Sequence, residues 1–174
     1  MTSTRLGITV MLLTLLLGAG NAMAKPNGSA FIGIGFPTGD FKSGFDGGWT
    51  AGGYLTASVT PIFEVGGTIS YTEFESLLGD IPIIGKYFGE DFDTWEFHAL
   101  GQANIIFLRA FLGMGWANHS GVQYMGDDGR RTDFSWQLGM SAKFLVFETR
   151  LSYHSIDLDE TSTDWGIFTI GLTF

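Results

Sequence analysis

The sequence has no cysteine, only four prolines and only nine lysine and arginine residues among its 174 positions. Without cysteine, a small secreted fold held together by disulfides is excluded. The few basic residues stand against 18 acidic ones, and this negative balance argues against nucleic acid as a partner. Glycine is abundant, at 26 residues, and aromatic residues make up 15% of the chain. The stability of such a chain must come from packing and hydrogen bonding rather than from covalent cross-links.

Only the N-terminus carries a long apolar run. Arg5 precedes an apolar stretch over 8–17, and the segment closes with Ala22-Met23-Ala24, a small-x-small cleavage site. This pattern predicts a secretory signal peptide over 1–24, because the alternative of a membrane anchor would need a longer apolar run. The mature chain is then 25–174, a single domain with eight basic and 18 acidic residues and a net charge of −10.

Apolar and polar residues alternate along most of the mature chain. Counting back from Phe174, every second residue is apolar or glycine, and the residues between are mostly small or hydroxylated. Such a period of two predicts β-strands of about nine to eleven residues, and no helical periodicity competes over a comparable length. The eight predicted strands are Ala30–Phe36, Trp49–Val59, Phe63–Tyr71, Trp95–Ala103, Leu108–Trp116, Phe134–Phe144, Phe147–Tyr153 and Asp164–Phe174.

The connections between these strands alternate in length. Short turns are expected near Thr60-Pro61, over 104–106 and at Leu145-Val146, and long polar connections are expected over 37–48, 73–93, 118–133 and 157–164. Short turns at one end and long loops at the other are typical of an outer-membrane β-barrel. The pattern therefore predicts an all-β fold, an eight-stranded antiparallel up-and-down transmembrane β-barrel with both termini on the periplasmic side.

The last residue is aromatic and lies within the last predicted strand. In lipid, every backbone N–H and C=O group must find a partner inside the protein, so a sheet has to close on itself. We therefore expect the last strand to pair with the first, and Phe174 to face lipid in the periplasmic aromatic girdle.

Alternation alone does not say which face points outward. A soluble barrel such as a lipocalin would keep its apolar residues inside. The interior of an eight-stranded barrel is narrow, however, and glycine, serine, threonine and a few charges fit it better than rows of large apolar side chains. The polar face is therefore predicted to line the lumen, where its ionisable side chains pair with one another. This predicted lumen ion-pair network comprises Glu64, Glu96, His98, Arg109, Lys143, Glu148, Arg150 and His154.

Two segments of the sequence resemble a known family. The glycine-rich first strand leads into Phe36-Pro37-Thr38-Gly39-Asp40-Phe41, and the last strand is aromatic. In these features, and in length and architecture over 27–174, the chain resembles the small eight-stranded outer-membrane barrels of Gram-negative bacteria, the opacity-protein-like and attachment-invasion-type group. The resemblance implies insertion by the outer-membrane assembly machinery, which reads the last strand. Thr169 stands where that family commonly has glycine, and the assembly signal here is Phe168, Ile170, Leu172 and Phe174.

A narrow lumen argues against a solute channel and favours a locked network over an ion path. An enzyme is the other alternative, because the lipid A deacylase family carries a His-x-Ser-Asn stretch. The nearest match here is Tyr153-His154-Ser155-Ile156, in which the adjacent His154 and Ser155 point to opposite faces of a strand. Ser152 and His154 share a face, but it is the interior one. The sequence therefore predicts no catalytic residue, no metal site and no cofactor.

The connection over 73–93 is the main candidate for a functional surface, since its middle is apolar and acidic residues bracket it. The segment either folds back over the barrel mouth or forms a contact patch for a host surface, another envelope protein or the acyl chains of lipopolysaccharide. The patch comprises Leu77, Leu78, Ile81, Ile83, Ile84, Tyr87 and Phe88. Arg130-Arg131 is a candidate phosphate contact. The sequence thus predicts a non-enzymatic outer-membrane protein, surrounded by lipid and lipopolysaccharide, with an envelope-structural or surface-interaction role.

Overall fold

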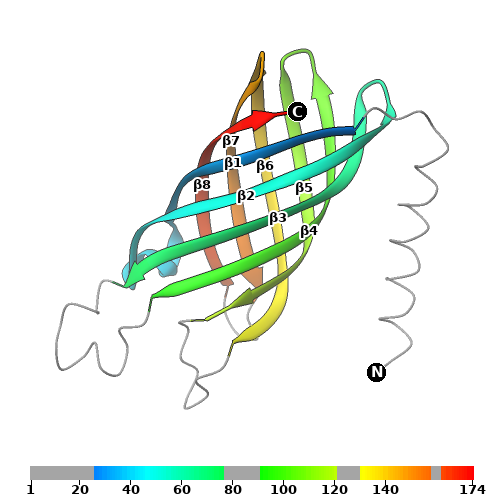
Figure 1. Ribbon diagram of the computed structural model, residues 1–174. Coiled ribbons are helices and arrows are strands. Elements are labelled where there is room, and N and C mark those ends of the chain that lie inside the picture. The colour runs from blue at the N-terminus through cyan, green and yellow to red at the C-terminus, as the bar shows by residue number, and fades with distance from the viewer. Residues whose placement is uncertain (1–25, 77–90, 121–129, 158–161) are drawn as a thin grey trace, which may run out of the picture.

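The computed structural model describes residues 26–76, 91–120, 130–157 and 162–174, which form a β-barrel (Figure 1). A 3-10 helix, η2, lies between the first two strands. Within the described ranges, no helix is long and apolar enough to cross a membrane. The elements are β1 (Pro26–Pro37), η2 (Gly39–Ser43), β2 (Phe45–Thr60), β3 (Phe63–Ser76), β4 (Phe92–Ile105), β5 (Leu108–His119), β6 (Arg131–Phe144), β7 (Phe147–Asp157) and β8 (Ser162–Thr173).

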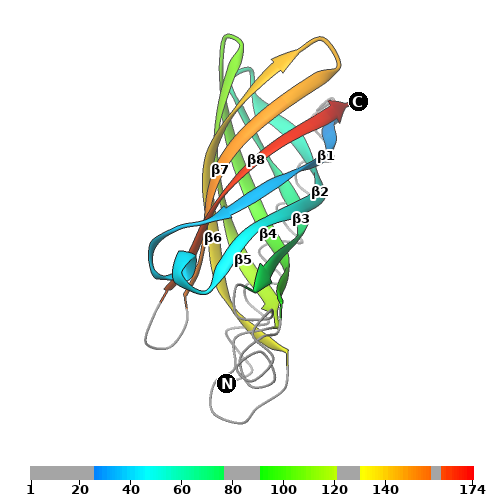
Figure 2. The same ribbon diagram turned by 90° about the vertical axis from the view of Figure 1, so that its left-hand side faces the viewer.

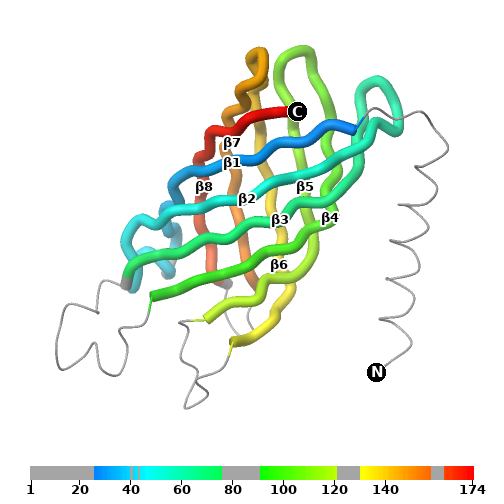
Figure 3. Tube along the Cα trace, in the orientation of Figure 1, coloured from blue at the N-terminus to red at the C-terminus, as the bar shows by residue number. Residues whose placement is uncertain are grey.

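The eight strands form one closed barrel in which each strand pairs with its neighbours in sequence. The last strand completes the circle, because β8 pairs antiparallel with β1 from Ser29 opposite Thr173 to Pro37 opposite Trp165. Figure 3 shows these two strands running side by side. Closure removes the unpaired sheet edges that lipid does not tolerate. The predicted fold class and the predicted pairing of the last strand with the first are both confirmed.

The strands are longer than the alternation predicted. They have 11 residues in β7 and up to 16 in β2. Most of the added residues lie at the end of the barrel that carries the long connections, here called the loop end. Phe45–Gly48 and Glu73–Ser76, which the sequence placed in connections, belong to β2 and β3. Antiparallel hydrogen bonding continues there because it does not require the apolar pattern by which the strands were recognised. The barrel is accordingly tall and narrow, with inclined strands (Figure 2).

The opposite end of the barrel, here called the short-turn end, has tight turns between β2 and β3, β4 and β5, and β6 and β7. Two of these turns hold a bulky residue in the left-handed region, Ile106 with φ 59° and Leu145 with φ 56°. Tight hairpin turns need positive φ and usually place asparagine or glycine there. Both side chains are exposed. Their apolar exposure fits turns that lie against a membrane interface rather than in bulk water.

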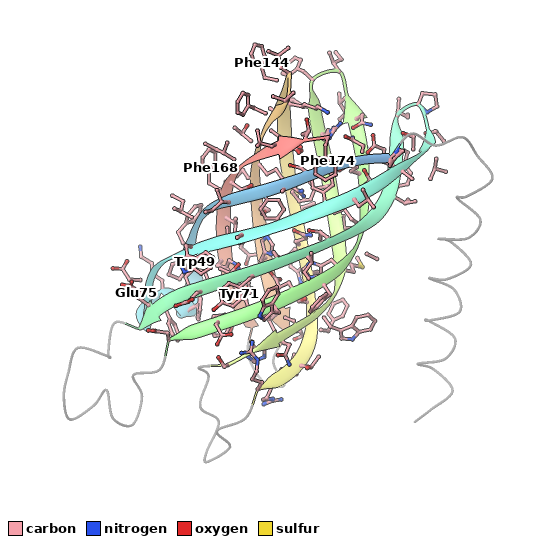
Figure 4. The ribbon with its side chains drawn as sticks, viewed as in Figure 1. Trp49, Tyr71, Glu75, Phe144, Phe168 and Phe174 are labelled. Atoms are coloured by element: carbon pink, nitrogen blue, oxygen red, sulfur yellow. The ribbon has the colours of Figure 1, made fainter. Side chains whose placement is uncertain are left out.

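The middle of the barrel is apolar outside and polar inside. On the outer face Ile32 is 65% exposed and Leu138 is 54% exposed, whereas Glu96 in the interior is fully buried. In Figure 4, the side chain of Phe144 lies at the short-turn end and that of Phe168 lies on the outer face. So extensive an apolar surface is stable only against lipid. The alternative of a soluble barrel with an apolar interior is therefore excluded.

A row of aromatic rings crosses three strands on the outer face near the loop end. The ring of Tyr71 on β3 lies between Trp49 on β2 and Trp95 on β4, with ring centroids 5.2 Å and 5.0 Å away. Figure 4 shows Trp49 and Tyr71 towards this end. Tryptophan and tyrosine are typical of the membrane–water interface, where an apolar ring and a polar group are both accommodated. The row therefore marks the boundary of the lipid-facing band.

Beyond this row the two faces exchange character. Phe74 points into the barrel and is fully buried, while Glu73, the preceding residue on β3, points outward. The same exchange occurs on β4, where Phe92 is buried and Asp93 lies on the outer side. Polar residues outside and apolar residues inside are the arrangement that water on the outer side requires. The loop end of the barrel therefore stands clear of the lipid.

Candidate functional site in the barrel lumen

The loop end of the lumen is filled by a cluster that we call the aromatic plug. It consists of Phe41, Phe45, Phe74, Phe92 and Trp165. η2 folds Phe41 over the mouth, where its ring centroid lies 4.5 Å from that of Phe45 and 5.0 Å from that of Phe92. Trp165 packs against Phe74 and Phe92 at 5.9 Å in each case. Described residues alone therefore close this end of the lumen by apolar packing.

A layer of two histidines around Glu96 lies beneath the plug. Glu96 Oε2 accepts a hydrogen bond from His154 Nδ1 at 2.8 Å, and the ring of His154 stacks on Trp165 with centroids 5.8 Å apart. His98 approaches the second carboxylate oxygen at 3.6 Å and shares a 2.7 Å hydrogen bond with Ser135. Glu96 thus contacts one histidine on β4 and one on β7. These histidines in turn contact Ser135 on β6 and Trp165 on β8.

One part of this layer has the hydrogen-bond order of a catalytic triad. Since His154 Nδ1 donates to Glu96, its Nε2 accepts from the hydroxyl of Ser152 at 2.9 Å. Serine, histidine and carboxylate in this order can activate a serine for nucleophilic attack. All three side chains lie inside the barrel, as expected for Ser152 and His154 from their shared strand face. The sequence did not reveal that Glu96, from another strand, would complete the chain.

A second charged layer lies closer to the short-turn end. The hydroxyl of Tyr54 donates to Glu148 Oε2 at 2.5 Å and accepts from Arg109 Nη1 at 3.0 Å. Arg109 Nη1 also lies 3.8 Å from Glu148 Oε1. Strands β2, β5 and β7 are thereby linked across the lumen. Glu148 thus has both a cationic and a hydroxyl partner, as a buried carboxylate needs.

Arg150 lies beside this layer in a different environment. Its guanidinium carbon is 4.1 Å from the ring centroid of Phe111, 4.5 Å from that of Tyr54 and 5.5 Å from that of Phe31. The faces of three aromatic rings thus surround the cation and stabilise it electrostatically. Among the described residues, no carboxylate lies within ion-pairing distance of Arg150. Its charge is held by aromatic faces rather than by an ion pair.

Glu64 closes the lumen at the short-turn end. Its carboxylate accepts hydrogen bonds from Gln102 at 2.5 Å, Thr56 at 2.7 Å and Asn104 at 2.9 Å. Asn27 adds a longer contact at 3.3 Å. These partners are amides and a hydroxyl, and no basic side chain of a described residue pairs with Glu64. This carboxylate is therefore held by neutral donors rather than by the ion pair that the sequence predicted.

The predicted network is thus divided among separate layers. Lys143 faces the lumen on β6 near the short-turn end, and within the described ranges it forms no ion pair. Of the three predicted lumen carboxylates, all among the described residues, Glu96 and Glu148 lie next to basic groups and Glu64 does not, so the eight residues do not form one continuous ion-pair network. The predicted signal peptide over 1–24 and the contact patch over 77–88 lie outside the described residues.

The basic pair Arg130-Arg131 lies at the loop end, next to carboxylates. Arg130 Nη2 is 2.7 Å from Asp93 Oδ2, and Arg131, which begins β6, has a guanidinium nitrogen 3.6 Å from Asp133 Oδ1. Asp93 also accepts a hydrogen bond from the hydroxyl of Ser120. Both guanidinium groups are therefore engaged by acidic side chains, which reduces their capacity to bind an external phosphate.

The aromatic plug was missed by the sequence reasoning, although a signal for it existed. Continuing the inward-facing series of β3 from Ser70 and Thr72 by one step leads to Phe74. The corresponding step back along β4 leads from Glu96 through Thr94 to Phe92. Both phenylalanines lie in the connection that the sequence predicts over 73–93, where the outward residues are no longer apolar.

Comparison with known proteins identifies the fold. No protein-family model matches the sequence, and no curated protein matches it either. Among solved structures, the barrel domain of Pseudomonas aeruginosa OprF matches with a TM-score of 0.54 at 15% identity, covering 87% of this chain and 100% of that one. Yersinia pestis Ail in a phospholipid nanodisc matches with a TM-score of 0.56 at 14% identity, covering 86% and 100%. The chain has the fold of the small outer-membrane β-barrels.

A third similar structure is that of Neisserial surface protein A, with a TM-score of 0.53 at 13% identity and coverage of 86% of this chain and 97% of that one. All three comparisons span nearly the whole described barrel. The family resemblance predicted from the sequence is therefore confirmed at the level of fold. Within the described ranges, no group of three or more histidine, cysteine or acidic side chains is arranged to hold a metal ion.

Proposed function

We propose that the protein is a non-enzymatic component of the outer membrane, exported through a signal peptide cleaved after residue 24, with an envelope-structural or surface-interaction role. The short-turn end then lies in the periplasm and the loop end lies outside the cell. The main support is the combination of an apolar outer band with a lumen that is plugged at the loop end. With the interior filled, the parts that can meet other molecules are the lipid-facing band and the connections at the loop end.

The charge of the loop end constrains its partners. Acidic side chains outnumber basic ones among the described residues at this end, and the connections over 77–90, 121–129 and 158–161 add more acids than bases. A polyanion is therefore a poor partner, even though a solved complex of Yersinia pestis Ail contains the heparin analogue sucrose octasulfate. We propose instead that the apolar residues over 77–88 contact a protein of the host or the envelope, and that lipid and lipopolysaccharide surround the band below.

The test replaces residues 77–90 with a short glycine–asparagine turn in cells that otherwise lack the protein. Because the strand pairing of β3 with β4 lies outside this segment, we expect the variant to fold and reach the outer membrane at wild-type levels. Two measurements then report the two roles: permeability of the envelope to a hydrophobic dye, and attachment of cells to host-cell or bacterial surfaces. A matched control shortens 121–129 instead. Unchanged permeability and attachment in both variants would contradict a role for these connections.

Assembly through the last strand gives a further prediction. Phe168, Ile170, Leu172 and Phe174 all face outward on β8 and its end. Phe174 exchanges two backbone hydrogen bonds with Gly28, at 3.0 Å and 3.2 Å, so its loss removes little of the barrel seam. We expect deletion of Phe174 to lower the outer-membrane level about tenfold if assembly machinery reads this residue, and to leave refolding in detergent nearly unchanged. Immunoblots of membrane fractions and heat-modifiability gels measure the two effects.

The Ser152–His154–Glu96 arrangement favours a lipid-modifying hydrolase as the second candidate function. A substrate would have to reach Ser152 through the aromatic plug or past the charged layers, and the adjoining cavity has a volume of only about 10 Å³. That space is about one water molecule. We therefore expect a fluorophosphonate probe to leave the folded protein unlabelled, and Ser152→Ala to leave lipid A unchanged in mass spectra of whole cells. Labelling of the wild type that Ser152→Ala abolishes would establish the hydrolase instead.

A further inference from the structure

Arg150 is a buried cation whose local charge is not balanced by an adjacent carboxylate. It is 6% exposed, and its nitrogen Nη1 is buried without a hydrogen-bond partner among the described residues. Glu148, the acid nearest in the same layer, is occupied by Tyr54 and Arg109. Buried charges in proteins are normally paired, because an unpaired ion loses its hydration without compensation. The cation–aromatic contacts offset part of this cost but supply no hydrogen-bond acceptor.

A small, partly open cavity lies next to Arg150. Its volume is about 10 Å³, and it is lined by Phe31, Ser70, Gln137, Arg150, Ser152, His154, Ile167 and Thr169. Two other lining residues also have buried polar atoms without a partner, Gln137 at Nε2 and Thr169 at Oγ1. Like Arg150, both side chains are more than nine-tenths buried. Residues that carry an amide, a hydroxyl and a guanidinium, all able to donate, thus line one small space.

We infer that this cavity binds a single small anion of the halide class, with chloride as the natural ligand. Three unsatisfied donors, one of them cationic, match a ligand that only accepts hydrogen bonds. The anion would neutralise Arg150, which no described carboxylate does at contact distance. Glu96 does not line the cavity, and its carboxylate contacts two residues that do, His154 and Ser70. The cavity has room for about one water-sized particle, which a monatomic anion matches more closely than phosphate, sulfate or a carboxylate does.

A bound anion would stabilise the closed barrel. The lining residues come from β1, β3, β6, β7 and β8, so one anion would connect strands on both sides of the seam between β1 and β8. A ligand that binds only the closed barrel stabilises it by mass action. This role concerns the folded barrel itself and does not depend on what the connections at the loop end contact.

The test compares unfolding of the mature protein, refolded in detergent, in sodium chloride and in sodium gluconate at equal ionic strength. Gluconate is too large for the cavity. For the wild type we expect the unfolding equilibrium constant to fall about tenfold in chloride at ten times the dissociation constant. Bromide should act like chloride. Gln137→Leu and Arg150→Gln should lose this dependence, whereas Lys143→Gln, which alters a lumen-facing base that does not line the cavity, should retain it.

Two results would overturn the inference. One is equal stability of the wild type in chloride and gluconate, which would mean that the cavity takes only neutral solvent. The other is a chloride dependence that persists in Gln137→Leu, which would place the anion elsewhere. If Arg150→Gln does not fold, Gln137→Leu decides the outcome, since it keeps the cation. Protein crystallised after refolding in bromide gives an independent readout, with an anomalous peak expected beside Arg150 and its absence counting against the site.

Discussion

Gly66→Ala is expected to prevent the barrel from closing, whereas Gly67→Ala is expected to leave it folded. A Cβ atom on Gly66 would lie 1.9 Å from the carbonyl oxygen of Leu55 and 2.7 Å from the Cα of Thr56 on β2. Both are backbone atoms of a paired strand, so the clash can be relieved only by separating β2 from β3. A Cβ on Gly67 would meet its nearest atom, the carbonyl oxygen of His98, at 3.5 Å, which is ordinary contact.

The expected loss for Gly66→Ala is at least about 3 kcal/mol in the free energy of unfolding, beyond the usual cost of overpacking, because backbone must move. Gly67→Ala should change that free energy by less than about 0.5 kcal/mol. The two variants are matched in residue type and strand, but Gly66 faces the lumen and Gly67 faces outward, so they differ in face as well as in what the added methyl group meets. Unfolding in urea, followed by heat-modifiable migration on gels, measures both. Similar stability of the two variants would show that the strands can separate at Gly66 without cost.

The sequence predicted the barrel because lipid imposes one rule on every strand that crosses it. Residues such as Leu138 and Ile32 must be apolar when they face acyl chains, and Gln137 or Ser135 can be polar because they face the interior. This rule acts on each strand separately, so it can be recognised without knowing which strands are neighbours. Eight strands, their faces and the closure of the last strand on the first all follow from it.

The strand ends could not be predicted in the same way, because the rule reverses where lipid gives way to water. Beyond Thr72 the outward residues of β3 are acidic and the next inward residue is Phe74, so the apolar residue changes face. A search for continuous alternation ends at that point and assigns the remaining residues of the strand to a loop. The turns at Ile106 and Leu145 were predicted from the gaps between alternating segments, but their positive φ values were not, since neither residue is of the type that usually takes positive φ.

The contacts inside the lumen depend on how far the strands are staggered around the barrel, which a single sequence does not reveal. Predicting that Glu148 faces the lumen requires only its place in β7. Predicting that Tyr54, from β2, would donate to it requires the registers of all the strands between them. The ionisable residues of the lumen were therefore predictable individually, whereas the Ser152–His154–Glu96 chain and the aromatic cage of Arg150 were not.

Phe92→Ala is expected to destabilise the barrel by about 3–5 kcal/mol, the usual cost of removing a fully buried aromatic ring from a packed core. Phe92 is completely buried and contacts Phe41, Phe74 and Trp165 in the plug. Phe107→Ala is the matched control, because Phe107 is an exposed turn residue and its loss should cost less than about 1 kcal/mol. Urea unfolding in detergent compares the two, and equal losses would show that the plug contributes no special stability.

The same variant tests whether the plug is what seals the lumen. We expect no steady conductance across planar bilayers for the wild type, because the plug, the histidine layer and the Glu148 layer lie in series. Phe92→Ala should also show no steady conductance, since the histidine layer and the Glu148 layer still fill the lumen below the plug. Discrete conductance in Phe92→Ala but not in Phe107→Ala would mean that the charged layers admit ions once one aromatic ring of the plug is removed. The lumen would then be an ion path that the aromatic plug closes. Its buried charges would line that path as well as link the strands.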